Sequence, residues 1–468
     1  MASGPAPRRS DPKSGLTGIP WPAVPGRWAA VLLGIQHEFE ASQWLPPTEV
    51  ARRQARAADA LLAYARQAVP YYRDRPEYGP GRAWSELPVL TREQIHASAA
   101  DLVSTDVPAD HLPLTDMTTS GSTGRPLTVK ATRVTGLFWL ACTLREHLWH
   151  GRDATATIVT LRTDRSGQIP PEGRVFPSWG PPIDTVYDTG PCAMMSVQQD
   201  VAVQAEFLVA HDPTYLLSLP SNLLALCRHF ARTGATLPRL REVRAYGEVV
   251  DPELRHACRR VWGVPVTDMY SSQELGYLAL QCPTSERYHV MAELVLVEVL
   301  DDDGRPCPPG GTGRVVVTQL HNYGMPLLRY DLGDYAQVGR PCPCGRGLPT
   351  LDRVVGRRRN MLVLPTGEIF WPTFGSAWKG LGDVIHQFQL VQQELDHIHA
   401  RIVGPRPLTA EEQSTVAAEL VRRFGYPFRV TFEFLAAIGR TPGAKFEDFV
   451  SLVGPGSYNR TGGGPGEG

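Results

Sequence analysis

The order of helix-like and strand-like segments in the middle of the chain constrains its fold more than any other feature. Short apolar runs bounded by turn residues alternate there with longer segments whose apolar residues recur every three or four positions. The predicted elements are a helix at 50–68, a helix at 134–150, a strand at 154–161, a strand leading into a helix at 212–234, and strands at 240–248 and 264–272. Strands that alternate with helices indicate an α/β architecture with largely parallel sheets.

The pattern changes after residue 286, where strand-like segments are separated by Gly/Pro turns, as in an antiparallel or barrel-like subdomain. A final α+β unit contains three short strands and a helix that begins at a capping box from Thr409 to Glu412. We therefore predict a large domain of mixed and parallel sheets with a barrel-like subdomain, followed by a small mobile α+β domain. The predicted bounds are a disordered tail at 1–20, the large domain at 21–356, the small domain at 357–453 and a Gly-rich tail at 454–468.

The composition is that of an ordinary soluble protein long enough for more than one domain, with 468 residues, 42% hydrophobic and 20% charged. A formal net charge of −1 gives no general attraction to nucleic acid or to an anionic membrane surface. No apolar run approaches the roughly 18–20 residues that a membrane-spanning helix needs. The first fifteen residues lack the apolar segment of a secretory signal, so we expect a cytoplasmic monomer or homodimer without nucleic-acid or membrane partners.

Residues 118–126, with the sequence TTSGSTGRP, form the first of three polar motifs. Small residues let the backbone approach a polyphosphate closely, and hydroxyls and successive N–H groups can then bind its oxygens. The segment is not a Walker A loop, because the chain contains no Gly-Lys-Ser/Thr. Taken alone, it is equally consistent with a flexible Ser/Gly turn.

The second and third motifs each combine a carboxylate with neighbours suited to a nucleotide. In DMYSSQE, from Asp268 to Glu274, a carboxylate beside hydroxyls suits Mg²⁺, and the aromatic ring can stack on a base. In LRYDLGD, from Leu328 to Asp334, the final carboxylate can accept hydrogen bonds from both ribose hydroxyls. Taken alone, the second motif fits a polar loop that caps a helix better, and the third fits a strand that ends in a Gly-Asp turn.

Together and in this order, the three motifs resemble those of the adenylate-forming superfamily, which includes acyl-CoA synthetases, luciferases and the adenylation domains of peptide synthetases. Three further segments are similar to family motifs: AYGE at 245–248, DRVVGRRRNM at 352–361 and IGRTPGAKFEDFV at 438–450. The resemblance covers residues 80–453 and is closest to the phenylacetate–CoA ligase branch. It implies a large domain that binds ATP and an acid, and a small domain that carries a catalytic lysine.

The resemblance implies a role for each residue that matches a family motif. Phosphate binding is implied for Thr119, Ser120, Gly121, Ser122, Thr123 and Gly124, and the adenine site for Gly247, Glu248, Tyr270 and Ser271. Mg²⁺ binding is implied for Glu274, and ribose binding for Asp334, assisted near the hinge by Arg353 or Arg357. Catalytic roles are implied for Lys445, Glu274 and Ser272, with ATP and Mg²⁺ as cofactors and coenzyme A as the acceptor.

A lysine suits the implied chemistry, because attack of a carboxylate on the α-phosphorus brings two anions together. The chain has four lysines, and Lys445 lies in a Gly-rich, loop-like segment; a solvated surface lysine is the alternative interpretation. Two departures from the family pattern stand out. The hinge has Arg357-Arg-Arg-Asn360 where an acidic residue is usual, and the phosphate loop continues with Pro-Leu-Thr, without the lysine common elsewhere in the superfamily.

Two groups of cysteines can be distinguished. Cys142, Cys192, Cys227 and Cys258 stand alone among apolar residues, as small reduced core residues do. Cys282 and His289, followed by Cys342 and Cys344, form two short-spaced pairs that fit a structural zinc site with four filled positions. Some members of the phenylacetate-ligase branch carry a similar set. Cys307 is a spare candidate ligand, and free thiols with a surface histidine are the alternative.

The implied reaction converts an acid and ATP into an acyl-AMP and pyrophosphate, and then transfers the acyl group to coenzyme A. The branch suggests an aryl or arylalkyl acid, such as an amino- or hydroxy-substituted benzoate, bound near Phe138, Trp139, Tyr246 and Gly276. Alternative acceptors are a carrier-protein thiol or an amine. More distant alternatives are activation of nitrite for diazotisation of an arylamine, and a non-catalytic nucleotide-binding scaffold.

Overall fold

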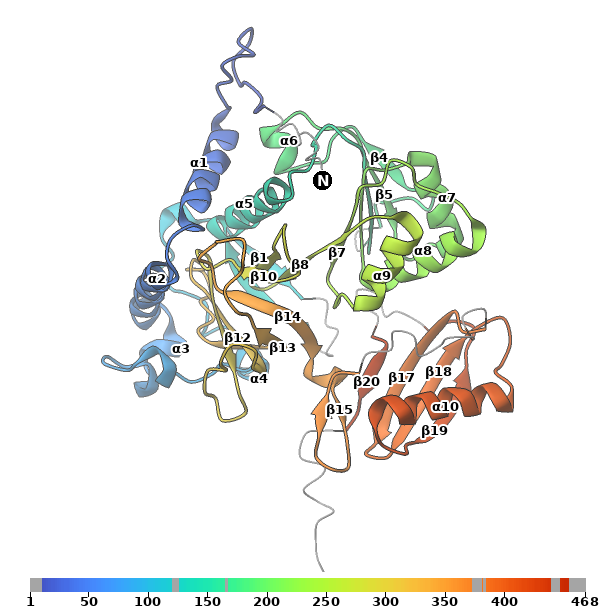
Figure 1. The fold of residues 1–468 in the computed structure, drawn as a ribbon. Helices are drawn as coiled ribbons and strands as arrows, with labels where there is room; N and C mark the ends of the chain where they lie inside the picture. The colour runs from blue at the N-terminus through green and yellow to red at the C-terminus, as the bar shows by residue number, and fades with distance from the viewer. Residues whose placement is uncertain are drawn as a thin grey trace, which may run out of the picture.

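The computed structural model describes residues 11–119, 126–164, 167–372, 381, 384–438 and 447–453. Within them, the larger part of the molecule is built on one twelve-stranded sheet, whose order is β11-β12-β13-β14-β10-β9-β8-β7-β6-β3-β5-β4 (Figure 1). The predicted α/β class, with a large sheet domain and a small C-terminal unit, is confirmed. The phosphate loop at 120–125 and the lysine segment at 439–446 lie outside the described residues.

One half of this sheet is parallel. It consists of β3 (Ile158–Arg162), β5 (Cys192–Ser196), β6 (Tyr215–Ser218), β7 (Glu242–Tyr246) and β8 (Val266–Ser272), with the antiparallel β4 (Arg174–Phe176) at its edge. The connecting helices are α6 (Ile183–Val186), α7 (Val201–His211), α8 (Pro220–Thr233) and α9 (Pro252–Trp262). Leu223, Leu226 and Phe230 of α8 are at most 1% exposed and pack with Val243 of β7 in one apolar core. Proline at the first position of α8 and the left-handed Gly234 after it set where this helix begins and ends.

The other half of the sheet is antiparallel. It consists of β9 (Gly276–Gln281), β10 (Tyr288–Val290), β11 (Val295–Leu300), β12 (Thr312–Gln319), β13 (Tyr330–Val338) and β14 (Thr350–Arg357). The two halves meet at β8, which is parallel to β7 on one side and antiparallel to β9 on the other. The antiparallel strands predicted after residue 286 therefore continue the same sheet.

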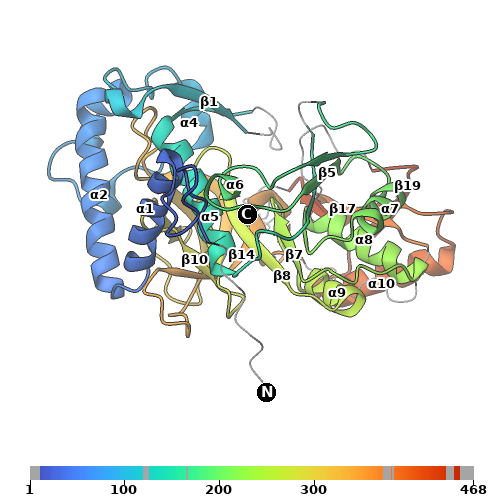
Figure 2. The same ribbon diagram turned by 90° about the horizontal axis from the view of Figure 1, so that it is seen from above.

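Helices from the N-terminal part of the chain cover this antiparallel half (Figures 1 and 2). They are α1 (Arg27–Ser42), α2 (Pro47–Ala68), α3 (Pro70–Arg73), α4 (Arg92–Ala97) and α5 (Arg133–Trp149), with the 3₁₀ turns η1 (Pro76–Tyr78), η2 (Trp84–Glu86) and η3 (Ala109–His111) between them. The hairpin of β1 (Leu114–Thr118) and β2 (Thr128–Thr132) precedes α5. The helices predicted at 50–68 and 134–150 correspond to α2 and α5.

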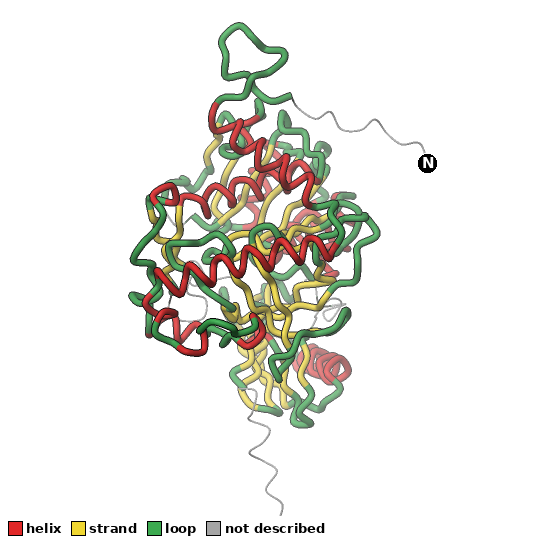
Figure 3. The backbone as a smooth tube through the Cα atoms, turned by 90° about the vertical axis from the view of Figure 1, so that its left-hand side faces the viewer, coloured by secondary structure: helices red, strands yellow, loops and turns green. Residues whose placement is uncertain are grey.

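Part of the tail predicted to be disordered, residues 11–20, makes backbone contacts in the structure. Pro12 bridges to Tyr187, and the backbone N–H of Lys13 donates to the carbonyl of Val186 at 2.7 Å. The N–H of Gly15 donates to the carbonyl of Val24 at 2.7 Å. Composition does not indicate these contacts, because backbone hydrogen bonds do not depend on the side chains. The loop lies at the top of the molecule in Figure 3.

The C-terminal unit is a separate four-stranded sheet in the order β19-β18-β17-β20 (Figure 1). Its elements are β17 (Gln387–Glu394), β18 (His397–Val403), α10 (Ala410–Phe424), β19 (Arg429–Phe434) and β20 (Phe449–Ser451). It follows η4 (Arg358–Asn360) and the hairpin of β15 (Leu362–Val363) and β16 (Ile369–Phe370). The predicted capping box is present: Thr409 Oγ1 accepts from the N–H of Glu412, whose carboxylate accepts from the N–H of Thr409. Val416 and Leu420 of α10 pack on Leu390 and Ile398 of the sheet.

None of the helices within the described ranges is long and apolar enough to cross a membrane.

Candidate functional site

The sheet register brings the second and third sequence motifs together. Asp334 of β13 lies opposite Arg357 of β14, and the Arg357 Nε is 3.5 Å from the Asp334 Oδ1. From the end of β8, the hydroxyl of Tyr270 donates to the Asp334 Oδ2 at 2.9 Å. Burial raises the pKa of Tyr270, and the neighbouring Asp334 carboxylate raises it further, so the phenol stays protonated and able to donate. Asp334 is thus held between a neutral donor and a cation.

The segment after Tyr270 places Glu274 beside the same group. Ser272 Oγ accepts from the N–H of Leu275 at 3.1 Å, which turns the chain after β8, and Glu274 is 9% exposed. Burial makes the largest contribution to the raised pKa of the Tyr330 hydroxyl, and the negative charges of Glu274 and Asp334 raise this pKa further. The two carboxylates therefore act on one small region, where a hard cation bound to phosphates would find oxygen ligands.

The AYGE segment lies at the end of the neighbouring strand. β7 is parallel to β8, with Tyr246 paired to Met269, so the carboxyl ends of the two strands lie side by side. Gly247 has φ of 80°, a conformation that glycine adopts at little cost. Glu248 then accepts from the N–H of Ser221 at the start of α8 at 2.9 Å. The carboxyl ends of parallel strands, where open α/β sheets bind their ligands, thus carry the predicted adenine segment.

The other predicted nucleotide residues divide into three groups. Thr119 Oγ1 accepts from the N–H of Leu127 and from Arg92, both at 2.9 Å. Arg353 is exposed and lies opposite Gln337, away from Asp334, so of the two candidate arginines the geometry selects Arg357. Ser120 through Gly124 and Lys445 lie outside the described residues.

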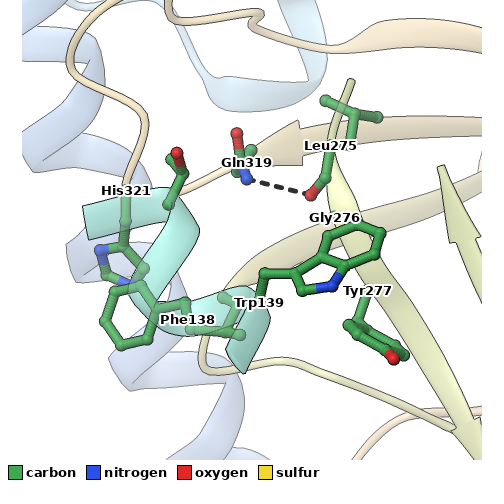
Figure 4. Close-up of a pocket in the computed structure, with 9 residues that line it drawn as sticks. Phe138, Trp139, Leu275, Gly276, Tyr277, Gln319 and His321 are labelled. Atoms are coloured by element: carbon green, nitrogen blue, oxygen red, sulfur yellow. Dashed lines mark hydrogen bonds between the residues drawn. The ribbon is translucent and has the colours of Figure 1, made fainter. Parts of the chain in front are cut away.

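A small pocket, partly open to solvent, lies between α5, β9 and the end of β12 (Figure 4). Its lining consists of Thr135, Phe138, Trp139, Leu275, Gly276, Tyr277, Leu294, Gln319 and His321. Trp139 and Tyr277 have ring centroids 5.0 Å apart, and Phe138 and His321 4.9 Å apart. Gly276 has φ of 82° at the bend that leads into β9, where side chains other than glycine would be strained.

Two polar groups interrupt this aromatic lining. Gln319 Nε2 donates to the carbonyl of Leu275 at 3.0 Å, which fixes the orientation of the amide (Figure 4). His321 Nε2 donates to the carbonyl of Glu293 at 2.8 Å, and burial lowers the pKa of this imidazole, which favours its neutral form.

Three of the four residues predicted near the acid line this pocket: Phe138, Trp139 and Gly276. Tyr246 does not, because its side chain is directed to Arg162 and Thr163. Sequence reasoning missed Gln319 and His321, which come from the end of a distant strand. Thr135 could have been found, since it precedes Phe138 and Trp139 by three and four positions on one helical face.

The two Cys/His pairs converge at one place on the antiparallel half. Cys282 follows β9 and His289 lies in β10, while Cys342 and Cys344 lie in the turn between β13 and β14. β10 pairs with β14, with His289 opposite Thr350, and this register brings the two turns together. The ligand atoms of the four residues lie within 4.8 Å of one another. Cys307 lies outside the group, with its Sγ 3.7 Å from the carbonyl of Thr312.

The separations within this cluster suit a tetrahedral ion. The Sγ atoms of Cys282 and Cys342 are 3.7 Å apart, and the Sγ of Cys344 is 3.3 Å from His289 Nε2. Zinc–sulfur and zinc–nitrogen bonds in a tetrahedron place ligand atoms about 3.5–3.8 Å apart. Burial disfavours the Cys282 thiolate, but hydrogen bonds from His289, Thr284 and Ser285 lower its pKa to about 4. The buried His289 Nδ1 finds no hydrogen-bond partner among the described residues.

The four cysteines predicted to be reduced core residues are buried and free, as predicted, but two of them do not stand alone, because the Sγ atoms of Cys227 and Cys258 are 3.7 Å apart. They lie in the core: Cys142 in α5, Cys192 in β5, Cys227 in α8 and Cys258 in α9.

Comparison with known proteins places this geometry in a family. The model of the AMP-binding enzyme family matches residues 82–323, and that of the CapK C-terminal domain matches residues 367–451. A phenylacetate–coenzyme A ligase of Thermus thermophilus is 26% identical over 264 residues. That alignment covers 54% of this chain and 59% of the relative, so it spans less than two thirds of the relative's length.

Solved structures show the same fold over most of the chain. A 2-hydroxyisobutyryl-CoA ligase, in the postadenylation state with 2-HIB-AMP, superposes with a TM-score of 0.67 at 18% identity. The match covers 88% of this chain and 91% of that one. An anthranilate CoA ligase in complex with anthranoyl-AMP has a TM-score of 0.53 at 16% identity, covering 77% of this chain and 73% of the other. The motif DMYSSQE lies within the matched residues 82–323, LRYDLGD follows them closely, and the two motifs meet at one site. Because the family model spans more than half of the chain, this chain belongs to the AMP-binding enzyme family.

Proposed function

We propose that the protein catalyses ATP-dependent adenylation of an aryl or arylalkyl carboxylic acid and then transfers the acyl group to coenzyme A. The observation that carries the proposal is the meeting of Tyr270, Asp334 and Arg357 at the carboxyl ends of β7 and β8. A carboxylate held between a neutral donor and a cation can accept both hydroxyls of a ribose. The CoA ligase relatives named above support the choice of reaction.

In the proposed first step, a carboxylate oxygen of the acid attacks the α-phosphorus of ATP. The bond from that phosphorus to the α–β bridging oxygen breaks, and pyrophosphate leaves with the electron pair. Asp334 would orient the ribose, and Glu274 would help to hold a Mg²⁺ that neutralises the phosphates. Lys445, placed by sequence alone, would supply positive charge where the two anions meet.

The acid would occupy the pocket between α5 and β9. Its aromatic side chains, Phe138, Trp139 and Tyr277, favour a flat apolar group through stacking and edge contacts. The amide of Gln319 provides a polar contact for a substituent on such a group.

ATP–pyrophosphate exchange against a panel of aryl acids tests the proposal, with Lys445→Ala measured in parallel. Exchange that depends on one acid and falls about 100-fold or more in the variant is expected. Adding coenzyme A, a carrier protein or an amine to the preformed adenylate then identifies the acceptor. No exchange with any acid, but AMP release when nitrite and an arylamine are present, would replace the carboxylate by nitrite as the activated group.

We also propose that residues 357–453 form a small domain that moves relative to the large one. Its own sheet and core support this division, as does the match of residues 367–451 to a separate domain model. Arg359 of the hinge segment pairs with Glu447 of the small domain at 2.6 Å. Limited proteolysis with and without a non-hydrolysable acyl-adenylate analogue would test the motion, since closure should slow cleavage between residues 357 and 386.

Cys282, His289, Cys342 and Cys344 would hold a structural zinc ion that joins the β9–β10 and β13–β14 turns. Zinc would supply no chemistry to the reaction, because four protein ligands fill its tetrahedral positions. Metal analysis of the purified protein tests this, and about one zinc per chain is expected. A metal content near zero, with all four side chains open to thiol and imidazole reagents, would contradict the assignment.

A further inference from the structure

A chain of four buried charges lies between α5 and β7, outside every motif of the sequence analysis. Glu242, the first residue of β7, accepts two bonds from Arg152, from Nε to Oε2 at 2.9 Å and from Nη2 to Oε1 at 2.7 Å. The same Arg152 Nη2 lies 2.6 Å from Glu146 Oε1, and the second oxygen of Glu146 accepts from Arg244 Nη2 at 2.5 Å. The four side chains are between 0% and 10% exposed. Two carboxylates and two guanidiniums therefore alternate in one buried network.

This network is neutral as a whole. Burial alone would raise the pKa of Glu146, but the neighbouring Arg152 and Arg244 bring it well below its usual value, so this carboxyl is ionised. Burial lowers the pKa of the adjoining His147, and the two arginines lower it further, so this imidazole is uncharged. When charges cancel in this way, replacing a buried ion pair by uncharged side chains often costs little folding free energy. The stability of the fold is therefore a weak reason for the Glu146–Arg244 pair.

The face of α5 that carries Glu146 also carries one wall of the acid pocket. Trp139, Thr143 and Glu146 are four and three positions apart, so they lie on one face of the helix. The ring of Trp139 packs on that of Tyr277, with centroids 5.0 Å apart (Figure 4), and the Tyr277 hydroxyl lies 3.2 Å from Thr143 Oγ1. Burial and the Glu146 carboxylate raise the pKa of Tyr277 to about 12, and Arg244 opposes them, so the ion pair lies close to this wall of the pocket.

Arg244 belongs to the strand that ends in the predicted adenine segment. Val243, the residue before it, is fully buried in the core that β7 shares with α8 and α9, so Arg244 is directed to the opposite face of the sheet, toward α5. The pairing of β7 with β6 and β8 fixes the position of Arg244 along the strand. Three residues later the chain reaches Gly247, where the predicted adenine segment turns. The ion pair thus connects the helix of the acid pocket with the strand of the nucleotide segment.

We propose that the Glu146–Arg244 pair is a positioning element for adenylation: it sets the place of α5 relative to β7, and with it the separation between the acid and the α-phosphorus. Attack requires the reacting atoms to lie about 3–3.5 Å apart and in line, and a displacement of about 1 Å can cost roughly 100-fold in rate. This inference rests on the proposed function. Neither side chain lines the acid pocket, so loss of the pair should slow the reaction without weakening the binding of acid or ATP.

Acid-dependent ATP–pyrophosphate exchange by the full chain and its variants tests this inference. Glu146→Gln combined with Arg244→Met removes both charges of the pair and leaves Arg152 bound to Glu242. This double variant is expected to lower kcat about 10- to 100-fold, while the KM values for acid and ATP stay within about 2-fold of wild type. Glu146→Asp, which keeps the charge but shortens the side chain by one methylene, should lower kcat about 5-fold with the same unchanged KM values.

The neighbouring Arg145 provides the matched control. Its Nη2 lies 3.1 Å from Glu293 Oε1 and donates to the carbonyl of Phe39 at 3.2 Å, so this buried pair ties the same helix to the chain after β10 and to α1. Arg145→Met combined with Glu293→Gln again removes two opposite charges and should leave kcat within about 2-fold of wild type. Thermal melting of both double variants compares their stability.

Each outcome bears on one of the two proposals. A wild-type kcat in Glu146→Asp or in the Glu146/Arg244 double variant would overturn this inference, and so would an equal loss of kcat in both double variants. A higher KM for the acid with an unchanged kcat would overturn it as well. If the Glu146/Arg244 double variant does not fold, Glu146→Asp alone decides, by a reduced kcat with unchanged KM values or by a wild-type kcat. A wild-type protein without acid-dependent exchange would instead overturn the proposed function, and this inference with it.

Discussion

The Cys/His cluster and the nucleotide site are both assembled from distant parts of the chain, but they are held in different ways. Four ligand atoms of the cluster converge within 4.8 Å because the register between β10 and β14 joins two tight turns. At the proposed nucleotide site, Tyr270 lies near the end of β8, Glu274 follows that strand and Asp334 comes from the middle of β13, while the predicted phosphate loop and lysine lie in segments that the structure does not describe. With a metal ion bound as proposed, the cluster would be a closed site that stabilises the fold, whereas the proposed nucleotide site has to stay open to its ligand.

This difference predicts that substitutions in the two regions have opposite signatures. Changes at the nucleotide site should reduce activity and leave stability intact, and changes in the cluster should do the reverse.

The largest expected effect is on activity. Asp334→Ala should lower kcat/KM for ATP about 100-fold, since it removes hydrogen bonds from two ribose hydroxyls to a charged acceptor, worth about 3 kcal/mol in total. The melting temperature should fall by only about 2–4 °C, because the substitution leaves a single buried donor, the Tyr270 hydroxyl, without its acceptor. ATP–pyrophosphate exchange and thermal melting check this. Asp331→Ala, which removes a pair to Arg314, is the control and should retain the wild-type kcat/KM.

A substitution in the Cys/His cluster should instead reduce stability and leave activity intact. Cys342→Ser should reduce bound zinc to about a tenth of the wild-type content and lower the melting temperature by roughly 5 °C or more, because metal binding contributes to folding free energy. The KM for ATP of the protein that remains folded should stay within about 2-fold of wild type. Cys307→Ser is the matched control, since this thiol lies outside the cluster and should change neither quantity. A stable, metal-free Cys342→Ser protein would remove the contrast between the two regions.

The acid pocket gives a third, intermediate case. Trp139→Ala should raise the KM for the acid about 10-fold, through loss of aromatic contact with the substrate and with Tyr277, while the KM for ATP is unchanged. Trp21→Ala changes a tryptophan that is 82% exposed and should leave both constants unaltered. Equal increases in the two KM values would mean that the pocket does not hold the acid.

The smallest expected effect distinguishes two arginines of β14. Arg357→Gln should raise the KM for ATP about 3-fold, because a partly exposed ion pair orients Asp334 only weakly. Arg353→Gln, on the exposed part of the same strand opposite Gln337, should have no effect. If Arg353→Gln raised the KM for ATP and Arg357→Gln did not, the pairing of β13 with β14 would not identify the arginine that assists ribose binding.

The parts of the fold and of the candidate site that could be predicted from the sequence are those fixed by residues close together in the chain. The helix from Ala410 to Phe424 was predictable because its capping box is local, and the strand and helix within 212–234 because Pro220 and Gly234 mark the helix ends. The convergence of Cys282, His289, Cys342 and Cys344 was predictable because two short-spaced Cys/His pairs are a pattern typical of zinc sites.

Other features depend on pairings between distant segments. Gln319 and His321 enter the pocket because β12 ends beside β9, and Arg92 reaches Thr119 because Leu90 pairs with Tyr330. Neither pairing leaves a periodic signal in the sequence. Arg353 and Arg357 are equivalent in the hinge motif, and only their register against β13 separates them.

The position of β8 has a consequence for how this protein is made. During synthesis the parallel strands and their helices leave the ribosome first, but β8 can bond to β9 only after residue 281 has emerged. Until then the outer edge of β8 presents unpaired N–H and C=O groups, and such an edge can pair with another chain. A nascent chain that is stalled when β8 has emerged but β9 is still inside the ribosome is therefore expected to be especially prone to aggregation, and the few residues of β9 that end this state also complete the bend at Gly276.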